Sequence, residues 1–202
     1  QVFYEVSETQ RLDTVSKLLA HFRPERTLAF CNTKQQCRDL VAVLQAQGYS
    51  ALALFGELEQ RERDQVLVQF SNRSCSVLVA TDVASRGLDV EGLEAVINVD
   101  VTPDPEIHIH RIGRTGRAGA AGHAVSLVCA DEAKELAGIE RLIKQLIPRQ
   151  ILEGFAPVNP LPESKLNPKP NKPKKPKAPR VGHRDGQRPA NVSGKPATSR
   201  VK

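Results

Sequence analysis

The stretch SVLVATDVASRGLD, residues 76–89, decides the fold of this chain. Its first half is a continuous apolar run, and its second half turns polar at Thr81 and Asp82 before an Arg-Gly pair that implies a tight turn. A strand that is apolar throughout is typical of a parallel sheet covered on both faces by helices. In such sheets the functional groups lie on the loops that follow the carboxyl ends of the strands.

The same alternation extends in both directions from this stretch. Short apolar runs occur at VFYEV, TLAFC, ALALF, AVINV and HAVSLV, with segments of helical period between and after them. Asn32 or Thr33 can cap the helix after TLAFC, and Gly48 lies where a left-handed residue would end that helix. The pattern predicts an α/β, doubly wound domain, with a mostly parallel sheet and helices on both faces.

Composition divides the chain into an acidic body and a basic tail. From Lys165 onward there are twelve Lys or Arg against one acid, a balance of +11, which leaves 17 basic and 22 acidic residues before it. Ten of the 14 prolines lie between Pro157 and Pro196. We therefore expect a folded domain at 1–147, an extension at 148–164 and a disordered, Pro/Lys-rich tail at 165–202. Polyanions are the expected partners of this tail, and a solubilising linker is the alternative.

The remaining composition narrows the class of protein. Four cysteines, Cys31, Cys37, Cys75 and Cys129, show no CxxC spacing, so we expect buried free thiols and neither a zinc site nor a disulfide framework. No segment reaches the ~18 consecutive apolar residues that span a bilayer, and no signal peptide opens the chain. These features predict a soluble, cytoplasmic protein without a membrane partner.

The stretch HRIGRTGRAG, residues 110–119, places three arginines at intervals of three among three glycines. Planar guanidinium groups bind phosphate oxygens in pairs and can neutralise the charge that develops on a transferring phosphoryl group. An arginine finger acts in this way. A Gly/Arg loop is also typical of a solvated surface or a nucleic-acid patch, so the spacing alone leaves both alternatives open.

Two further stretches carry candidate residues. In ATDVASRGLD, residues 80–89, an acid at a strand end could accept hydrogen bonds from ribose hydroxyls, or Asp82 could only cap the next segment. In LFGELEQRERD, residues 54–64, Gln60 and Arg63 lie three apart near the start of a predicted helix, where side chains and N–H groups can both meet phosphate. A run of alternating Glu and Arg is equally typical of a solvated helix face.

Together these stretches resemble the C-terminal RecA-like domain of DEAD-box ATP-dependent RNA helicases over about residues 2–147. LAFCNTK resembles motif IV of that family, GELEQRER its QxxR element, VLVATDVASRGLDV its motif V and HRIGRTGR its motif VI, in the family's order. The GELEQRER and NRSCSVLVATDVASRGLD wording is closest to the DbpA subgroup, whereas PRQILEGFAPVNP resembles the extension of RhlE-like members. The resemblance implies a RecA-like fold and, for a complete protein, ATP-driven unwinding of short RNA duplexes or remodelling of RNA–protein complexes.

The resemblance also implies nucleotide-site residues. Arg114 and Arg117 match the arginines that reach the γ-phosphate across the interdomain cleft, with Arg114 as the first candidate for the finger. Asp89, with the backbone around Gly87, matches the position that holds the ATP ribose. His110 matches the histidine that couples the cleft to the first domain, and so it is expected to relay hydrogen bonds and not to act as a general base.

Four residues match positions that contact the RNA sugar-phosphate backbone: Asn32, Gln60, Arg63 and Thr81. Such contacts are largely blind to base sequence. Arg86 and Arg111 are expected to brace loops or the interdomain contact. One departure from the family concerns its HGD pattern, which reads Phe55-Gly56-Glu57 here, so the contact made by that histidine side chain is in doubt.

Parts of an ATPase are missing from the sequence. It contains no GxxxxGK[ST] phosphate loop and no DEAD sequence. The resemblance implies that these parts, with the ligands of the Mg²⁺ that accompanies ATP, belong to a first RecA-like domain that would be this chain's main partner. The start at Gln1 also suggests a fragment. We therefore expect an ATP-dependent RNA helicase at the level of the family and no efficient ATP hydrolysis by this chain alone.

Two alternatives remain at this stage. A DNA-directed superfamily 2 translocase shares the general layout and an arginine-bearing final motif, although its motifs would not match ATDVASRGLD and HRIGRTGR so closely. A non-catalytic RNA-binding or regulatory module, made of this domain and its tail, belongs to a different class. Comparing RNA- and DNA-stimulated ATPase tests the first alternative, and a salt titration of RNA binding tests the second.

Overall fold

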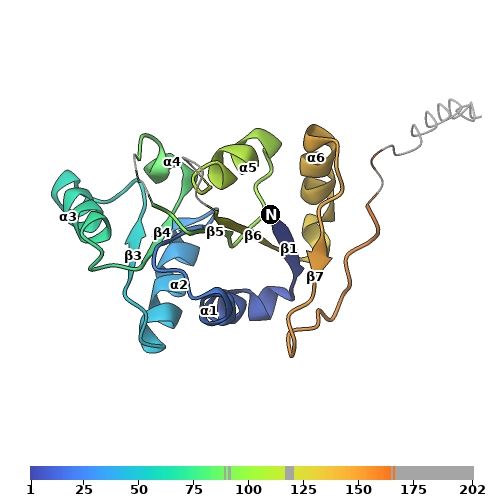
Figure 1. Cartoon of the computed structure of the whole chain (residues 1–202), viewed down its shortest axis with the longest axis horizontal. Coiled ribbons are helices and arrows are strands. Elements are labelled where there is room, and N and C mark those ends of the chain that lie inside the picture. Colours follow the sequence, from blue (N-terminus) through green and yellow to red (C-terminus); the bar gives the residue numbers. More distant parts are fainter. Residues whose placement is uncertain (89, 91, 117–120, 165, 167–202) are drawn as a thin grey trace, which may run out of the picture. The chain divides into compact units, whose positions relative to one another are not determined.

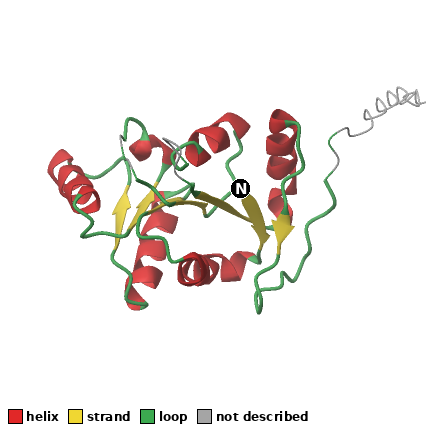
Figure 2. Cartoon of the chain, viewed as in Figure 1, coloured by secondary structure: helices red, strands yellow, loops and turns green. Residues whose placement is uncertain are grey.

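Seven parallel strands form the central sheet in the part of the chain that the structure describes (Figures 1 and 2). The structure is a computed structural model, and it describes residues 1–88, 90, 92–116, 121–164 and 166. The strand order is β3-β4-β2-β5-β6-β1-β7. The strands are β1 (Val2–Glu5), β2 (Thr27–Phe30), β3 (Ala51–Leu54), β4 (Val77–Ala80), β5 (Ala95–Asn98), β6 (His123–Val128) and β7 (Arg149–Gln150).

Helices cover both faces of this sheet (Figure 1). The helices α1 and α2 lie on one face, α4, α5 and α6 lie on the other, and α3 lies beside the β3 edge. Their bounds are α1 (Arg11–Phe22), α2 (Lys34–Ala46), α3 (Gln60–Ser71), α4 (Asp82–Ser85), α5 (Pro105–Ile112) and α6 (Ala133–Ile143), with 3-10 turns η1 (Glu8–Gln10) and η2 (Ala130–Glu132). This arrangement confirms the predicted doubly wound α/β fold.

Alternate residues of each strand fill the two sides of the core. In β2, Ala29 packs in the cluster that contains the apolar residues of α1 and α2, whereas Leu28 and Phe30 pack on the other side with Phe70 of α3. Each of these side chains is at most 1 % exposed. Because a strand that is covered on both faces must be apolar at every position, the continuous apolar runs of the sequence mark the strands correctly.

The predicted helix caps after β2 are also observed. The Thr33 hydroxyl accepts a hydrogen bond from the Gln36 backbone N–H at 3.2 Å, and the Gln36 side chain accepts one from the Thr33 N–H at 3.1 Å. This reciprocal pair fixes the start of α2. Gly48 adopts a φ of +85° just beyond the helix, a backbone conformation that favours glycine. Thr33 is therefore the cap, and Asn32 is left for other contacts.

The chain returns to the sheet after α6. β7 pairs with β1, so that Phe3 lies opposite Arg149, and Leu161 packs against the apolar cluster beneath α6. Arg149 Nη2 lies 3.7 Å from Glu140 Oε1, and the Glu140 side chain is 2 % exposed. Residues Gln1–Pro168 form one compact unit. The tail predicted at 165–202 lies outside the described residues except for Leu166.

Two expectations about composition can be compared with the structure. All four cysteines are buried and free, and burial raises the pKa of the Cys75 thiol. No helix in the described part of the chain combines the length and apolarity needed to cross a membrane. Within the same residues, no group of three or more His, Cys, Asp or Glu side chains could hold a metal ion.

Candidate functional site

The helix α5 carries the candidate residues of motif VI to the carboxyl edge of the sheet. Asp104 caps its start, because its Oδ1 accepts a hydrogen bond from the Glu106 N–H at 2.9 Å. Pro105 occupies the first turn, where an N–H group would have no partner within the helix. The last turn contains His110, and Arg114 follows just beyond the Gly113 that ends the helix. The cap and the proline thus fix the start of this short helix at the carboxyl edge of the sheet.

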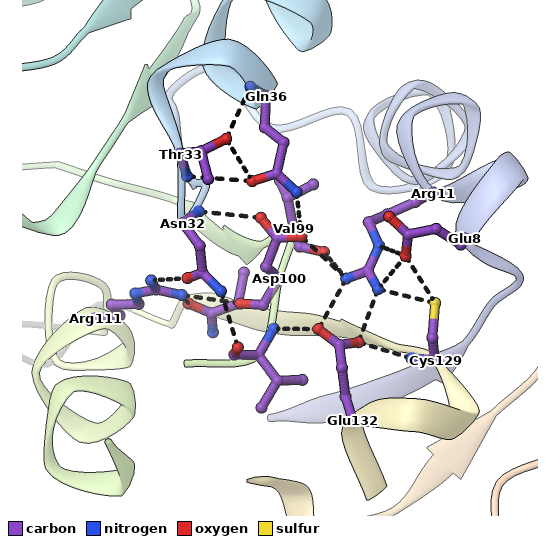
Figure 3. Close-up of polar contacts among 12 residues, drawn as sticks. Glu8, Arg11, Asn32, Thr33, Gln36, Val99, Asp100, Arg111, Cys129 and Glu132 are labelled. Carbon is purple, nitrogen blue, oxygen red and sulfur yellow. Dashed lines mark hydrogen bonds and ion pairs between the residues drawn. The ribbon is translucent and has the colours of Figure 1, made fainter. Parts of the chain in front are cut away.

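Arg111 is the residue that joins the loops of this edge (Figure 3). Its side chain is 1 % exposed, and its guanidinium lies 5.1 Å from the centre of the Phe30 ring. All five N–H donors of this guanidinium are used. The acceptors are Asp82 Oδ1 and Oδ2, both at 2.7 Å, Asn32 Oδ1 at 2.9 Å, the Asp100 carbonyl at 2.9 Å and Asn98 Oδ1 at 3.4 Å. Arg111 therefore connects α5 with the loops that follow β2, β4 and β5.

A cleft of about 400 Å³ lies over this brace. Its lining residues come from the ends of β2 and β4, the turn after α4, and α5: Phe30, Asp82, Ser85, Arg86, Asp104, Glu106, Ile107, His110, Arg111 and Arg114. His110 and Arg86 are exposed, and Arg114 is half-buried. Because Arg111 has no donor to spare, Arg86 and Arg114 are the arginines among the described lining residues that can meet a ligand here.

The turn of motif V lies directly against the segment that follows α5. Arg114 Nη1 donates to the Leu88 carbonyl at 2.9 Å, and the Thr115 hydroxyl donates to the Leu93 carbonyl at 2.7 Å. Gly87 adopts a φ of +73°, which lets the chain turn back at this point. The structure therefore brings Arg114 next to the residues that flank the predicted ribose acid. Asp89 itself and Arg117 lie outside the described residues.

The four residues predicted to contact RNA follow three neighbouring strands. Gln60 begins α3, and its amide donates to Asp64 at 2.7 Å. Arg63 Nη2 donates to the Ala84 carbonyl at 2.7 Å, which ties α3 to α4. Thr81 stands at the start of α4, and its hydroxyl makes no cap bond. Asn32 uses both ends of its amide, accepting from Arg111 and donating to the Val101 carbonyl at 3.1 Å.

Known proteins match this chain closely. The helicase conserved C-terminal domain family matches residues 10–119. The ATP-dependent RNA helicase DbpA of Escherichia coli K12 is 50% identical over 139 residues, covering 69% of this chain and 30% of DbpA. The RhlB helicase of Photorhabdus laumondii is 37% identical over 185 residues, covering 92% of this chain and 43% of RhlB. The chain thus spans less than half the length of these relatives.

Solved structures match as well. The E. coli DEAD-box protein SrmB, bound to the regulator RraA, superposes with a TM-score of 0.76 at 30% identity, over 81% of this chain and 97% of that one. S. cerevisiae Dbp5 bound to RNA and ADP BeF3 has a TM-score of 0.69 at 29% identity, over 75% of this chain and 41% of Dbp5. The chain is a DEAD-box C-terminal RecA-like domain. Its sheet, its helices and the order of its motifs are those of this family.

The departure from the DEAD-box HGD pattern has a structural explanation. Phe55 is 7 % exposed and packs in the core on the side of α1 and α2, with the Arg38 guanidinium 4.8 Å from its ring centre. Glu57 instead binds Lys34, whose Nζ lies 2.7 Å from Glu57 Oε2, and this contact lowers the pKa of the Glu57 carboxyl. The loop before α3 is thereby tied to the first residue of α2. The position that carries a histidine in the family pattern is therefore a core residue in this chain.

The buried face of α5 holds a second histidine. His108 is 1 % exposed, and its ring stacks on Phe3 at 5.6 Å. Burial, and then the nearby Arg111 charge, lower its pKa to about 4, because both disfavour the imidazolium form. His108 Nδ1 has no hydrogen-bond partner in the described part of the chain. His110 lines the cleft, whereas His108, two residues before it, is part of the core. Of these two histidines, His110 is therefore the one that can meet a ligand in the cleft.

Sequence reasoning missed one cluster beside this site. Arg11, at the start of α1, is 3 % exposed and lies 3.2 Å from Asp100, which is 4 % exposed. Neither residue belongs to a motif singled out from the sequence. A signal was present, since Arg11 precedes the buried Val15, Leu18 and Leu19 at helical spacing and so falls on the apolar face of its helix. A charged residue at such a position requires a buried partner.

Proposed function

We propose that this chain is the second half of an ATP-dependent DEAD-box RNA helicase, which supplies the arginine finger, the ribose contact and part of the RNA track. One observation carries this proposal. Arg114 lies in the cleft at the end of α5 and is hydrogen-bonded to the Leu88 carbonyl, beside the turn that contains Gly87 and leads to Asp89. A γ-phosphate site and a ribose site are thus expected within one cleft, as a nucleotide requires.

The nucleotide is ATP with Mg²⁺, which the relatives' description as ATP-dependent helicases supports. When bound, the metal neutralises charge on the β- and γ-phosphates, and its ligands belong to the first RecA-like domain. The guanidinium groups of Arg114 and Arg117 stabilise the negative charge that develops on the γ-phosphate. His110, exposed in the same cleft, relays hydrogen bonds to the first domain. Asp89 and the backbone at Gly87 hold the ribose.

RNA binds across the loops that follow β2, β3 and β4. Gln60, Arg63 and Thr81 face the sugar-phosphate backbone, and the positive charge of Arg63 suits phosphate. Asn32 would have to exchange its bonds to Arg111 and Val101 for a contact with RNA. The Dbp5 structure with RNA and ADP BeF3 supports the same two ligand classes for this fold. Such backbone contacts predict little sequence preference.

The mechanism follows from a site divided between two domains. ATP that binds the first domain gains contacts with Arg114 and Arg117 only when the domains close, so ATP favours the closed state by its differential affinity. Closure also joins two half-sites for RNA into one track that bends a single strand and disfavours the duplex. Hydrolysis and phosphate release remove these contacts and reopen the cleft. This chain alone has half of each site.

The test is an ATPase assay of a two-domain protein, made by joining a DEAD-box first RecA-like domain, such as that of the DbpA relative, to the start of this chain. We expect RNA to stimulate hydrolysis strongly, DNA to do so weakly, and the 202-residue chain to show no turnover. Equal stimulation by DNA would favour a DNA translocase. RNA binding without any ATPase in the two-domain protein would favour the non-catalytic RNA-binding module.

A further inference from the structure

The first three residues after β5, 99–101, are each held by a side chain from another part of the fold. The carbonyls of Val99, Asp100 and Val101 accept hydrogen bonds from Arg11 at 2.7 Å, Arg111 at 2.9 Å and Asn32 at 3.1 Å, respectively. The Val101 N–H donates to Glu132 Oε1 at 3.1 Å. Three residues later this segment reaches Asp104, the cap of α5. Residues 99–101 are thus held by side-chain hydrogen bonds shortly before the cap of α5.

Asp100 lies at the centre of this arrangement (Figure 3). Its Oδ2 accepts from the Asn32 N–H at 3.0 Å, and its Oδ1 accepts from the Gln36 amide at 2.8 Å and lies 3.2 Å from Arg11 Nη1. Its own carbonyl binds Arg111. One buried carboxylate thus links the start of α2, the brace beneath the cleft and a cation on α1.

Arg11 completes the network from the far side. Its guanidinium also binds Glu132 Oε2 at 2.8 Å, Glu8 Oε2 at 2.7 Å and the Cys129 sulfur at 2.8 Å. Glu132 in turn accepts from the Cys129 N–H at 2.8 Å. Because buried charges are stable only when they are paired, Arg11 must keep these partners, and this requirement fixes the distance between α1, η2 and the segment 99–101. None of these groups lines the cleft.

We infer that Asp100, with Arg11, is a positioning residue for the cleft: the pair places the start of α5 and thereby orients His110 and Arg114. This inference rests on the proposed function for its catalytic consequence, but the placement of α5 can be tested without it. The physical reason is that a loop of three residues separates the pair from the helix cap, so a shift of residues 99–101 moves α5 as a unit. A displacement of about 1 Å at a reacting group costs up to ~10²-fold in rate.

The first experiment measures amide hydrogen exchange of the 202-residue chain with Asp100→Asn. Asparagine keeps the size of the side chain and an oxygen acceptor, but it removes the charge that faces Arg11. We expect protection in α5 to fall about tenfold and protection at the start of α2 to fall less, because Asn32 or Gln36 loses an acceptor, while protection in α3 and α6 changes less than twofold. Unchanged protection in α5, or an equal loss in all helices, would overturn the inference. Arg11→Lys should give a smaller loss in the same segment.

The matched control is Arg149→Met. It breaks the ion pair between Arg149, on the edge strand β7, and the buried Glu140. We expect protection to fall in α6 and β7 and to persist in α5. If Arg149→Met loosened α5 as much as Asp100→Asn does, the effect would be a general loss of stability and the positioning role would be rejected.

The second experiment separates rate from binding in the two-domain protein. We expect Asp100→Asn to lower kcat about tenfold and to change the KM for ATP and the Kd for RNA by less than twofold, with Arg149→Met unchanged in all three. A kcat within twofold of the parent protein, at a temperature where Asp100→Asn is folded, would reject the catalytic consequence. An inactive parent protein would count against the proposed function, and the exchange measurement would still decide whether Asp100 places α5.

Discussion

Arg111 and Arg114 show that the environment of an arginine decides whether it braces the fold or faces a ligand. Both belong to the same Gly/Arg pattern, and their spacing alone does not show which of them binds a phosphate. The structure separates them, since Arg111 is 1 % exposed with five donors bound inside the domain, whereas Arg114 is half-buried in the cleft. The expectation that Arg111 braces loops is thereby confirmed.

Arg114→Ala should therefore act on chemistry and leave the fold intact. In the two-domain protein we expect kcat to fall by ~10³-fold, because an arginine finger contributes about this factor to kcat. Steady-state ATPase measurements check this, with Arg141→Ala as the control because Arg141 is exposed on α6 and contacts its own helix at Ala137. An Arg114→Ala protein with the parent's kcat would rule out the finger assignment.

His108 should make stability depend on pH. Its folded pKa of about 4 lies below the ordinary value of 6.5, so the folded state binds fewer protons than the unfolded state between these values. Stability is therefore present above pH 6.5 and is lost as the pH falls towards 4, by on the order of 3 kcal/mol. Urea unfolding at pH 7, 5.5 and 4.5 would measure the loss. His108→Phe should flatten this slope, and an unchanged slope would contradict the prediction.

The Lys34–Glu57 contact should restrain RNA binding. Lys34 follows Asn32 and Thr33 in motif IV. Its ammonium donates hydrogen bonds to the Glu57 carboxylate, and this contact lowers the pKa of Glu57. Glu57→Gln should release this ammonium for phosphate and raise RNA affinity about two- to threefold at low salt, with no gain at high salt, because both side chains are exposed and screened. Fluorescence anisotropy measures this. Glu153→Gln is the charge control, and an equal gain there would mean that net charge alone is responsible.

At the scale of elements, the extension after α6 contributes to the folded sheet. β7 covers the β1 edge, Leu161 adds to the cluster around Phe3, and Arg149 pairs with the buried Glu140. A sequence boundary at residue 147 follows the end of the apolar helix, but it cannot reveal a two-residue strand. Such a short pairing has no periodicity, and only the approach of β1 creates it.

A chain that ends at residue 147 should therefore be less stable than one that ends at 164. Removing Arg149 leaves the buried Glu140 carboxylate without its cation, which costs about 3 kcal/mol or more, and the β1 edge is exposed to pairing with other chains. Thermal unfolding should show a clearly lower Tm for residues 1–147, whereas residues 1–164 should match the full chain. Equal Tm values for the three chains would show that the extension is dispensable.

At the scale of the whole molecule, the sequence divides into an acidic body and a basic tail that is predicted to bind RNA. The tail carries twelve Lys or Arg against one acid, and each cation near a phosphate releases counterions. Deleting residues 165–202 should weaken RNA binding at low salt and make the slope of log Kd against log salt shallower. A salt titration with a single-stranded RNA checks this. If affinity and slope both persist after the deletion, the tail is only a linker.

The sequence by itself determined the order of strands and helices, the α/β class, the family and the candidate residues of motifs IV, V and VI. These features depend on local patterns: continuous apolar runs mark strands buried on both faces, and loops after parallel strands must share one edge. Within the described residues, the predicted sites at Asn32, Gln60, Arg63, Thr81 and Gly87 do lie beyond strand ends, His110 lies in the last turn of α5 and Arg114 follows that helix.

Only the tertiary structure decided which polar side chains brace the fold and which face a ligand. Arg11 is 88 residues from Val99 and 121 from Glu132, yet it binds both, so no spacing in the sequence could pair them. Arg111 and Arg114 differ in burial, His108 and His110 differ in the face of α5 that they occupy, and Phe55 replaces a family histidine by entering the core. The reason is that burial and pairing are properties of several elements packed together, and a linear pattern describes one element at a time.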